Sequence, residues 1–238
     1  MPLSTKKTFF GDYVFEVCDN VYEPSEDSFF FAENLHLQAE ARVLDVGTGS
    51  GILGIIASKN AREVIFIDLN PYSIRCARQN ASINKVKSDI KFIQSDLFSS
   101  LTETTKFDVI LFNAPYVPTE QEEEESWIGR AWAGGTTGRQ VIDRFISTAP
   151  KQLESSGEIF LMQSNLANVE ETQEKFLSIG LETKVVSSLR LAFFETLFLL
   201  RVSFISARET VPGSSSFYFE LNKTIKPFVN ESEQKLSS

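Results

Sequence analysis

The four residues Asn113-Ala114-Pro115-Tyr116 combine two hydrogen-bond acceptors with an aromatic ring. A side-chain amide or an aromatic amine is a poor nucleophile because its lone pair is delocalised. The side-chain oxygen of Asn113 and the backbone carbonyl of Ala114 can accept both N–H bonds of such a nitrogen and turn its lone pair toward an electrophile. Tyr116 can stack on the planar group. The motif therefore predicts a site for chemistry on a planar nitrogen, with an ordinary turn as the alternative.

A glycine-rich segment, Asp45-Val46-Gly47-Thr48-Gly49-Ser50-Gly51, lies upstream of this motif. Glycines between a strand and a helix let the backbone approach a ligand closely. A dinucleotide fingerprint requires the pattern Gly-x-Gly-x-x-Gly, but here Ile52 occupies the third glycine position. The carboxylate of Asp45 would also lie unfavourably close to two phosphates. The segment thus favours a cationic or zwitterionic ligand over NAD.

Two further aspartates follow the next two predicted strands. Asp68 comes 19 residues after Gly49, the distance at which a carboxylate reaches ribose hydroxyls. Asp96 can accept a hydrogen bond from an adenine amino group. Together with Asp45 for an ammonium group, these positions predict S-adenosylmethionine as the cofactor, although Asp68 and Asp96 could each be a simple loop-start cap. The predicted cofactor-binding residues are Asp45, Gly47, Gly49, Asp68, Asp96, Leu97 and Asn113.

Short apolar runs alternate with helical segments from about residue 41 to residue 188, which predicts an α/β fold. The predicted strands are Arg42–Val46, Glu63–Asp68, Ile90–Gln94, Phe107–Phe112, Gly157–Gln163, Glu182–Ser187 and Thr196–Ser203. The predicted helices between them are Ile52–Asn60, Pro71–Asn84, Gln140–Thr148 and Val169–Ile179. We expect a parallel sheet with helices on both faces, closed by an antiparallel pair at the end of the chain. The polar motifs then lie at the carboxyl ends of the strands, where ligands bind.

Three regions are predicted along the chain. Residues 1–40 fall outside the alternation, and the aromatic helix Phe29–Leu37 within them predicts a cap segment over the cofactor site. Residues 41–204 form the expected catalytic domain. Residues 205–238 are richer in Ser, Thr, Asn and Lys, which predicts a tail that is partly ordered at most.

Composition and charge exclude several classes of protein. The chain has 238 residues, of which 42% are hydrophobic and 23% charged, so a packed core is expected. A net charge of −9 disfavours a direct nucleic-acid groove. No apolar run is long enough to span a membrane and no signal peptide is visible, which favours a cytoplasmic protein. Cys18 and Cys76 cannot make a disulfide framework, and with His36 they suggest no metal site.

The Asn-Ala-Pro-Tyr motif resembles the Asn-Pro-Pro-Tyr or Asp-Pro-Pro-Tyr motif of amino methyltransferases. Two more segments, residues 21–29 (Val-Tyr-Glu-Pro-Ser-Glu-Asp-Ser-Phe) and residues 131–145, are similar to those of the HemK-related glutamine methyltransferases of archaea and eukaryotes. The resemblance covers roughly Asp12 to Val202 and includes Phe193-Phe194-Glu195, which is typical of the archaeal type. Ala114 replaces the proline of the family motif, which keeps the carbonyl but makes the turn less rigid and adds a free N–H.

This resemblance implies a Rossmann-like class I methyltransferase fold. Its seven-stranded, mostly parallel sheet has one antiparallel strand and the order 3-2-1-4-5-7-6, with helices on both faces. The resemblance places Ser28 at the cofactor pocket. It implies that Asn113, Ala114, Pro115 and Tyr116 present the side-chain amide of the Gly-Gly-Gln glutamine of a class I peptide chain release factor.

The resemblance also implies a small zinc-binding activator subunit. Ile90–Gln94, expected at the sheet edge, either accepts a strand from this partner or is an ordinary solvated edge. The acidic run Glu122–Glu125 either steers a basic substrate loop or is a solvated loop. Two other functions stay open, namely N6-adenine methylation of nucleic acid and a non-catalytic S-adenosylmethionine-binding subunit.

Overall fold

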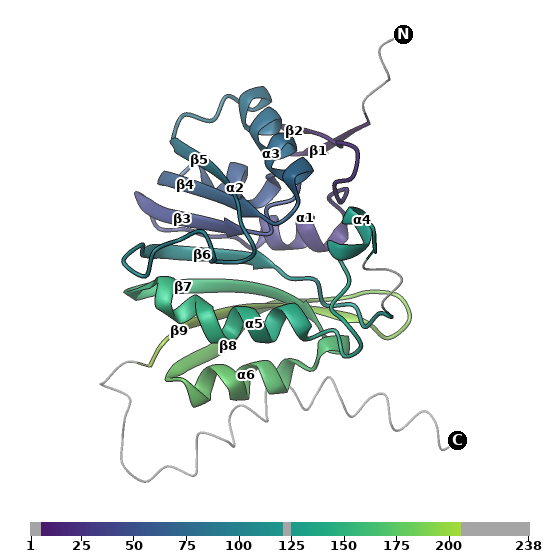
Figure 1. Ribbon diagram of the computed structural model, residues 1–238, viewed down its shortest axis with the longest axis vertical. Helices are drawn as coiled ribbons and strands as arrows, with labels where there is room; N and C mark the ends of the chain where they lie inside the picture. Colours follow the sequence, from purple (N-terminus) through teal and green to yellow (C-terminus); the bar gives the residue numbers. More distant parts are fainter. Residues whose placement is uncertain (1–5, 121–124, 206–238) are drawn as a thin grey trace. The chain divides into compact units, whose positions relative to one another are not determined.

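The computed structural model describes residues 6–120 and 125–205. A seven-stranded sheet runs through it, and Figure 1 shows how its strands are arranged. The sheet order is β5-β4-β3-β6-β7-β9-β8, and β9 runs antiparallel to both of its neighbours. The strands are β3 (Ala41–Val46), β4 (Ala61–Asp68), β5 (Asp89–Gln94), β6 (Phe107–Asn113), β7 (Leu153–Ser164), β8 (Leu181–Arg190) and β9 (Thr196–Phe204). Numbered from β3, this is the predicted order, so the predicted fold class is confirmed.

The parallel register brings the carboxyl ends of the central strands to one edge of the sheet. Val46 at the end of β3 pairs with Phe112 in β6, and Asn113 pairs with Met162 in β7. Helices cover both faces of these strands, which explains why β3, β4 and β6 consist largely of buried aliphatic and aromatic residues. Polar side chains that follow these strands therefore meet at a single edge.

Helices pack on both faces of the sheet (Figure 1). One face is covered by α1 (Glu26–Glu33), α2 (Ile52–Ala57) and α3 (Pro71–Ile83), and the other by α5 (Gln140–Thr148) and α6 (Val169–Ser178). The start of α3 is as predicted, because the Asn70 side chain accepts from the Tyr72 N–H and Pro71 takes the first helical position. Within the described ranges, no helix is long and apolar enough to cross a membrane.

An N-terminal hairpin precedes α1 and is missing from the sequence-based expectation. It consists of β1 (Lys7–Phe10) and β2 (Tyr13–Glu16). Asn80 in α3 and Asn84, the residue just after this helix, hold β2 by its backbone. Asn84 accepts from the Val14 N–H at 2.9 Å and donates to its carbonyl at 2.8 Å, while Asn80 accepts from the Glu16 N–H at 2.8 Å. These contacts join residues more than 60 positions apart, which local patterns do not reveal.

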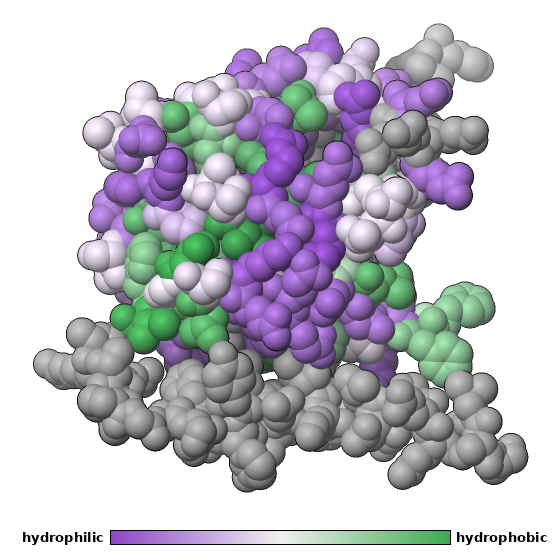
Figure 2. All heavy atoms as spheres, turned by 60° about the horizontal axis from the view of Figure 1, so that its bottom comes forward, coloured by the Kyte–Doolittle hydropathy of each residue, from purple (hydrophilic) through white to green (hydrophobic). Residues whose placement is uncertain are grey.

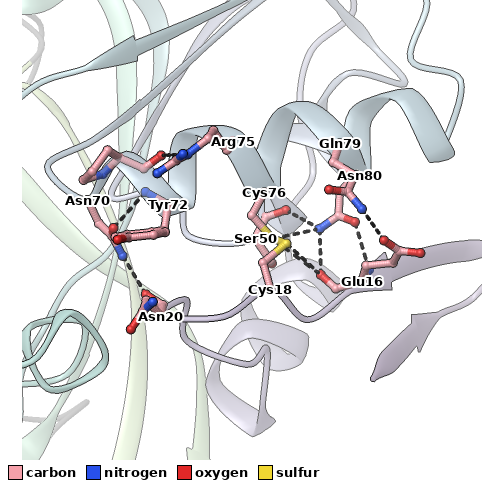
Figure 3. The surroundings of a disulfide bond; sticks show 11 residues. Glu16, Cys18, Asn20, Ser50, Asn70, Tyr72, Arg75, Cys76, Gln79 and Asn80 are labelled. Carbon is pink, nitrogen blue, oxygen red and sulfur yellow. Dashed lines mark hydrogen bonds between the residues drawn. A yellow bond between two sulfur atoms is a disulfide. The ribbon is translucent and has the colours of Figure 1, made fainter. Parts of the chain in front are cut away.

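Cys18, just after β2, forms a disulfide with Cys76 in α3, although the sequence suggested no such pair (Figure 3). A single disulfide is not a framework of several bridges, but it anchors the segment that leads into α1. The Asn20 carbonyl in this segment also accepts from Asn70 Nδ2 at 2.7 Å. The predicted tail beyond residue 205 and most of the Glu122–Glu125 run lie outside the described residues.

Candidate active site

A pocket of about 400 Å³ lies at the carboxyl edge of the sheet. Its walls come from the segment before α1, the turns after β3, β4, β5 and β6, and the region around the short helix α4 (Trp127–Arg130). A cavity of this size can hold a nucleoside-sized ligand with part of a substrate. The predicted site residues that line the pocket are Ser28, Gly47, Gly49, Asp68, Asp96, Leu97, Asn113, Ala114, Pro115 and Tyr116.

Asp45 does not line this pocket, contrary to its predicted contact with the ammonium group. Its side chain is buried beneath the glycine turn, where Oδ2 accepts from the Thr48 hydroxyl at 2.5 Å and from the Gly54 N–H at 3.0 Å. Desolvation in this position raises the pKa of the Asp45 carboxyl to about 7. A Cβ atom at Gly54 would lie 2.9 Å from Asp45 Oδ2 and even closer to Phe66. Asp45 therefore ties the glycine turn to α2.

Asp68 lies on the pocket wall at the end of β4. Its two carboxylate oxygens accept from the Gly49 N–H at 2.9 Å and the Asn70 N–H at 2.8 Å, which fixes the carboxylate between the glycine turn and the start of α3. Burial raises the pKa of Asp68 despite these hydrogen bonds. Gly49 itself has a φ of +56°, a conformation that glycine adopts at little cost. The turn and the carboxylate thus form one preorganised unit.

Asp96 and Leu97 lie on the neighbouring wall, after β5. The Asp96 carboxylate forms an ion pair with Arg144 of α5 at 2.7 Å. Both side chains of this pair are about half exposed, so it contributes at most about 1 kcal/mol to stability. Asp96 therefore stays at the pocket wall, where it is held by Arg144, a residue 48 positions later in the chain.

Asn113, at the end of β6, carries an unused hydrogen-bond acceptor. Its Nδ2 donates to Oδ2 of Asp27 in α1 at 2.9 Å, whereas its Oδ1 is buried and has no hydrogen-bond partner among the described residues. Buried polar atoms are normally paired, so an unpaired one at a pocket indicates a ligand contact. The sequence suggested a free N–H at Ala114. In the structure this N–H donates to the Met162 carbonyl at 3.3 Å.

Aromatic side chains complete the pocket beyond Asn113. Tyr116, Tyr22, Trp127 and Trp132 all line it. Burial raises the pKa of the Tyr116 hydroxyl, and the nearby negative charges of Asp27 and Glu195 add to this effect, so Tyr116 stays neutral. The two tryptophans lie in and just after the short helix α4, so this segment forms part of the pocket wall.

Several pocket residues were not predicted from the sequence. Asp27 precedes the predicted Ser28 in the segment 21–29 that carries the family resemblance, and this segment was the signal that could have identified it. The Ser50 hydroxyl is buried without a partner in the part of the chain that the structure describes, and it too lines the pocket. Asn70 could be recognised as a helix cap but not as a wall residue.

The sheet order and the pocket at its carboxyl edge define the chain as a class I methyltransferase. The family model described as methyltransferase small domain matches residues 24–130. A Methanocaldococcus jannaschii protein named as a protein N5-glutamine methyltransferase is 40% identical over 177 residues, which cover 74% of this chain and 88% of that protein. Human methyltransferase HEMK2 is 35% identical over 193 residues, covering 76% of this chain and 89% of HEMK2.

A solved structure agrees with these relatives. The E. cuniculi Mtq2–Trm112 complex, described as responsible for methylation of the eRF1 translation termination factor, matches with a TM-score of 0.62 and 25% identity. The match covers 78% of this chain and 99% of that chain. The chain belongs to the HemK-related family of protein N5-glutamine methyltransferases.

Proposed function

We propose that this protein transfers a methyl group from S-adenosylmethionine to the side-chain amide of the Gly-Gly-Gln glutamine in a class I peptide chain release factor. The observation that carries the proposal is the Oδ1 atom of Asn113, which is buried and has no hydrogen-bond partner among the described residues. An amide nitrogen of glutamine offers two N–H donors, and Asn113 Oδ1 with the Ala114 carbonyl would accept both. A relative named for N5-glutamine methylation and a solved structure described as responsible for methylation of the eRF1 termination factor support this substrate.

The pocket fits the proposed cofactor. Asp68 would accept from the ribose hydroxyls, since its carboxylate is already held at the wall by Gly49 and Asn70. Asp96 would accept from the adenine amino group beside Leu97, which offers an apolar surface. The cofactor would supply a methyl group already activated on a sulfonium. The unpaired Ser50 hydroxyl and Ser28 provide further polar contacts at the glycine turn.

The protein's contribution to the reaction is mainly position and polarity. Asn113 and Ala114 would hold the glutamine amide so that its lone pair faces the methyl group, and Tyr116 would stack on the amide plane. Asp27 accepts from Asn113 Nδ2, which keeps Oδ1 directed at the substrate. The amide nitrogen loses its proton after it has gained the methyl group, so no dedicated base is required before transfer.

A nucleic-acid amine is a poorer fit to this chain. An adenine amino group would also suit Asn113 and Tyr116, and the base would have to be flipped into the pocket. A strand of phosphates would then approach a protein of net charge −9, with Asp27 and Glu195 beside the catalytic tyrosine. A protein loop meets no such penalty, and a cytoplasmic release factor fits the predicted location of the chain.

A small zinc-binding activator subunit is proposed to bind β5. This strand is at the edge of the described sheet, and its apolar residues Ile90, Phe92 and Ile93 are only half-buried. A strand added here would complete the backbone hydrogen bonds of the edge. Hydrogen–deuterium exchange checks this proposal. Addition of the activator should protect residues 89–94, whereas β8 at the opposite edge should exchange as before. Equal exchange at both edges would exclude β5 as the binding strand.

Mass spectrometry of a recombinant class I release factor provides the functional test. The factor is incubated with this protein, the candidate activator and labelled S-adenosylmethionine. The proposal expects one added methyl group on the Gly-Gly-Gln glutamine, and none when that glutamine is replaced by asparagine. Cofactor binding by calorimetry without methyl transfer would instead favour another amine substrate or a non-catalytic subunit.

A further inference from the structure

The turn between β8 and β9 presents two aromatic side chains to solvent. Phe193 is 96% exposed and Phe194 is 90% exposed. Each is a large apolar side chain with almost no contact in the folded protein, which is unusual for phenylalanine. In Figure 1 this turn projects beyond the sheet, and the space-filling view shows hydrophobic side chains standing out at the corresponding right-hand margin (Figure 2).

The backbone of this turn is held in a costly conformation. Phe193 has a φ of +57° and Phe194 a φ of +64°, in the left-handed region that bulky residues rarely adopt. Such strain persists only where surrounding contacts impose it. Here the Leu191 N–H donates to the Glu195 carbonyl at 2.9 Å, closing the turn. Asn165 braces it from β7's end, since its Nδ2 donates to the Phe194 carbonyl at 3.3 Å and its Oδ1 accepts from the Thr196 N–H at 2.8 Å.

The turn belongs to the same edge of the sheet as the catalytic motif. Ser164 at the end of β7 pairs with Leu197, so the residues that precede β9 lie beyond the carboxyl end of β7. Asn113 ends the adjacent parallel strand at this edge. Glu195, the next residue after Phe194, is close enough to Tyr116 and Tyr22 for its charge to raise the pKa of both hydroxyls. The two phenylalanines therefore stand next to the pocket mouth.

Neither folding nor the pocket accounts for these side chains. They do not line the pocket, and they add nothing to the buried core. A rigid, strained and fully exposed aromatic pair beside an active site is suited to a partner that buries it, because a large preorganised apolar anchor gains binding energy at little entropic cost. Leu166, which follows the bracing Asn165, is 47% exposed and extends the apolar surface.

We propose that Phe193 and Phe194 are the docking point for the protein that carries the target glutamine, through an apolar patch adjacent to its glutamine loop. This inference rests on the proposed function. The occupant is a protein surface and not a nucleic acid, because the carboxylate of Glu195, the next residue in the turn, would repel phosphates at this position. Docking outside the pocket would hold the substrate loop over Asn113 without touching the cofactor.

Methylation kinetics on the full-length release factor test the inference. The variant is Phe193→Asn/Phe194→Asn, because asparagine tolerates left-handed backbone and removes both rings. The matched control is Phe9→Ser, which removes a 65% exposed phenylalanine of β1. The double asparagine variant should raise KM for the factor by about tenfold or more, with kcat within about twofold and cofactor affinity unchanged. Phe193→Leu/Phe194→Leu should restore most of the lost affinity.

The outcomes separate this inference from the proposed function. If the wild type is active and the double asparagine variant has the same KM for the factor, the docking proposal is overturned and the proposed function is not. No methylation by the wild type would overturn the proposed function and the docking with it. If a single-stranded oligonucleotide binds the wild type and does not bind the double asparagine variant, the assignment to a protein partner is overturned.

Discussion

The amide of Asn113 is oriented by Asp27, whose carboxylate accepts from Nδ2 at 2.9 Å, while Oδ1 has no hydrogen-bond partner among the described residues of the pocket. Asp27 is itself fixed, because its Oδ1 accepts from the Ser28 N–H at 2.6 Å and from the Ser25 hydroxyl at 3.0 Å. Without this carboxylate the asparagine amide could rotate by half a turn and present a donor where the substrate needs an acceptor. The helix α1 thus sets which atom of the Asn113 amide remains free to accept.

Replacement of Asn113 by alanine should lower kcat by about a hundredfold to a thousandfold, the usual effect of losing one oriented polar group at a reacting atom. Cofactor affinity should change little, because Asp68, Asp96 and the glycine turn remain in place. Single-turnover methylation of the release factor, together with calorimetric titration of the cofactor, measures the two effects separately. Equal losses in rate and cofactor affinity would contradict this division of roles.

Replacement of Asp27 by alanine should lower kcat by about tenfold to a hundredfold through misorientation of Asn113, with a smaller change in KM for the factor. The matched control is Glu26→Ala, which removes the exposed neighbouring carboxylate from the same first turn of α1. Asp27→Asn should retain more activity than Asp27→Ala, since an amide oxygen can still accept from Asn113. Similar kcat values for the Asp27→Ala and Glu26→Ala variants would show that Asp27 does not orient the motif.

Stability should fall as the pH rises from about 4 to about 7, because of Asp45. Burial raises its pKa to about 7 in the folded protein, whereas an unfolded aspartate titrates near 4. In this window the folded state retains a proton that the unfolded chain has released, so the free energy of unfolding decreases with pH and then levels off. The shift of roughly three units corresponds to at most about 4 kcal/mol.

Guanidinium unfolding of the wild type and of Asp45→Asn between pH 5 and pH 8 checks this expectation. The asparagine does not titrate, so the wild type should lose stability relative to the variant as the pH rises. The difference between the two proteins is the relevant quantity, since other groups titrate equally in both. A difference that stays constant over the whole range would show that Asp45 is ionised throughout.

Local patterns predicted the sheet and the pocket because both depend on short-range signals. Strand composition, the Asn70 cap and the polar residues at strand ends are all visible in short windows, and topology then brings them together. Asp45 illustrates the limit. An acidic residue at a strand end predicts a pocket residue, yet here the side chain turns inward to Thr48 and Gly54. Which way a side chain points depends on packing that no local pattern contains.

Long-range pairs were the other failure of sequence reasoning. The link between Asp27 and Asn113 joins residues 86 positions apart, and Cys18 lies 58 positions from Cys76. The N-terminal hairpin was missed for the same reason, since Asn80 in α3 and Asn84 just after it hold its second strand. Such contacts arise only after the sheet has placed distant segments side by side.

Reduction of the Cys18–Cys76 disulfide should destabilise the protein by about 2–4 kcal/mol, because the bridge restricts a loop of 58 residues in the unfolded chain. Guanidinium unfolding with and without dithiothreitol measures this loss. The Cys18→Ser variant is the control. It should match the reduced wild type and show no response to the reductant. In the native state the Asn20–Asn70 contact and the hydrogen bond from Asn80 to the Glu16 carbonyl still hold the N-terminal segment, so the reduced protein should fold. An unchanged unfolding midpoint after complete reduction, verified by thiol labelling, would show that the bridge adds nothing to stability.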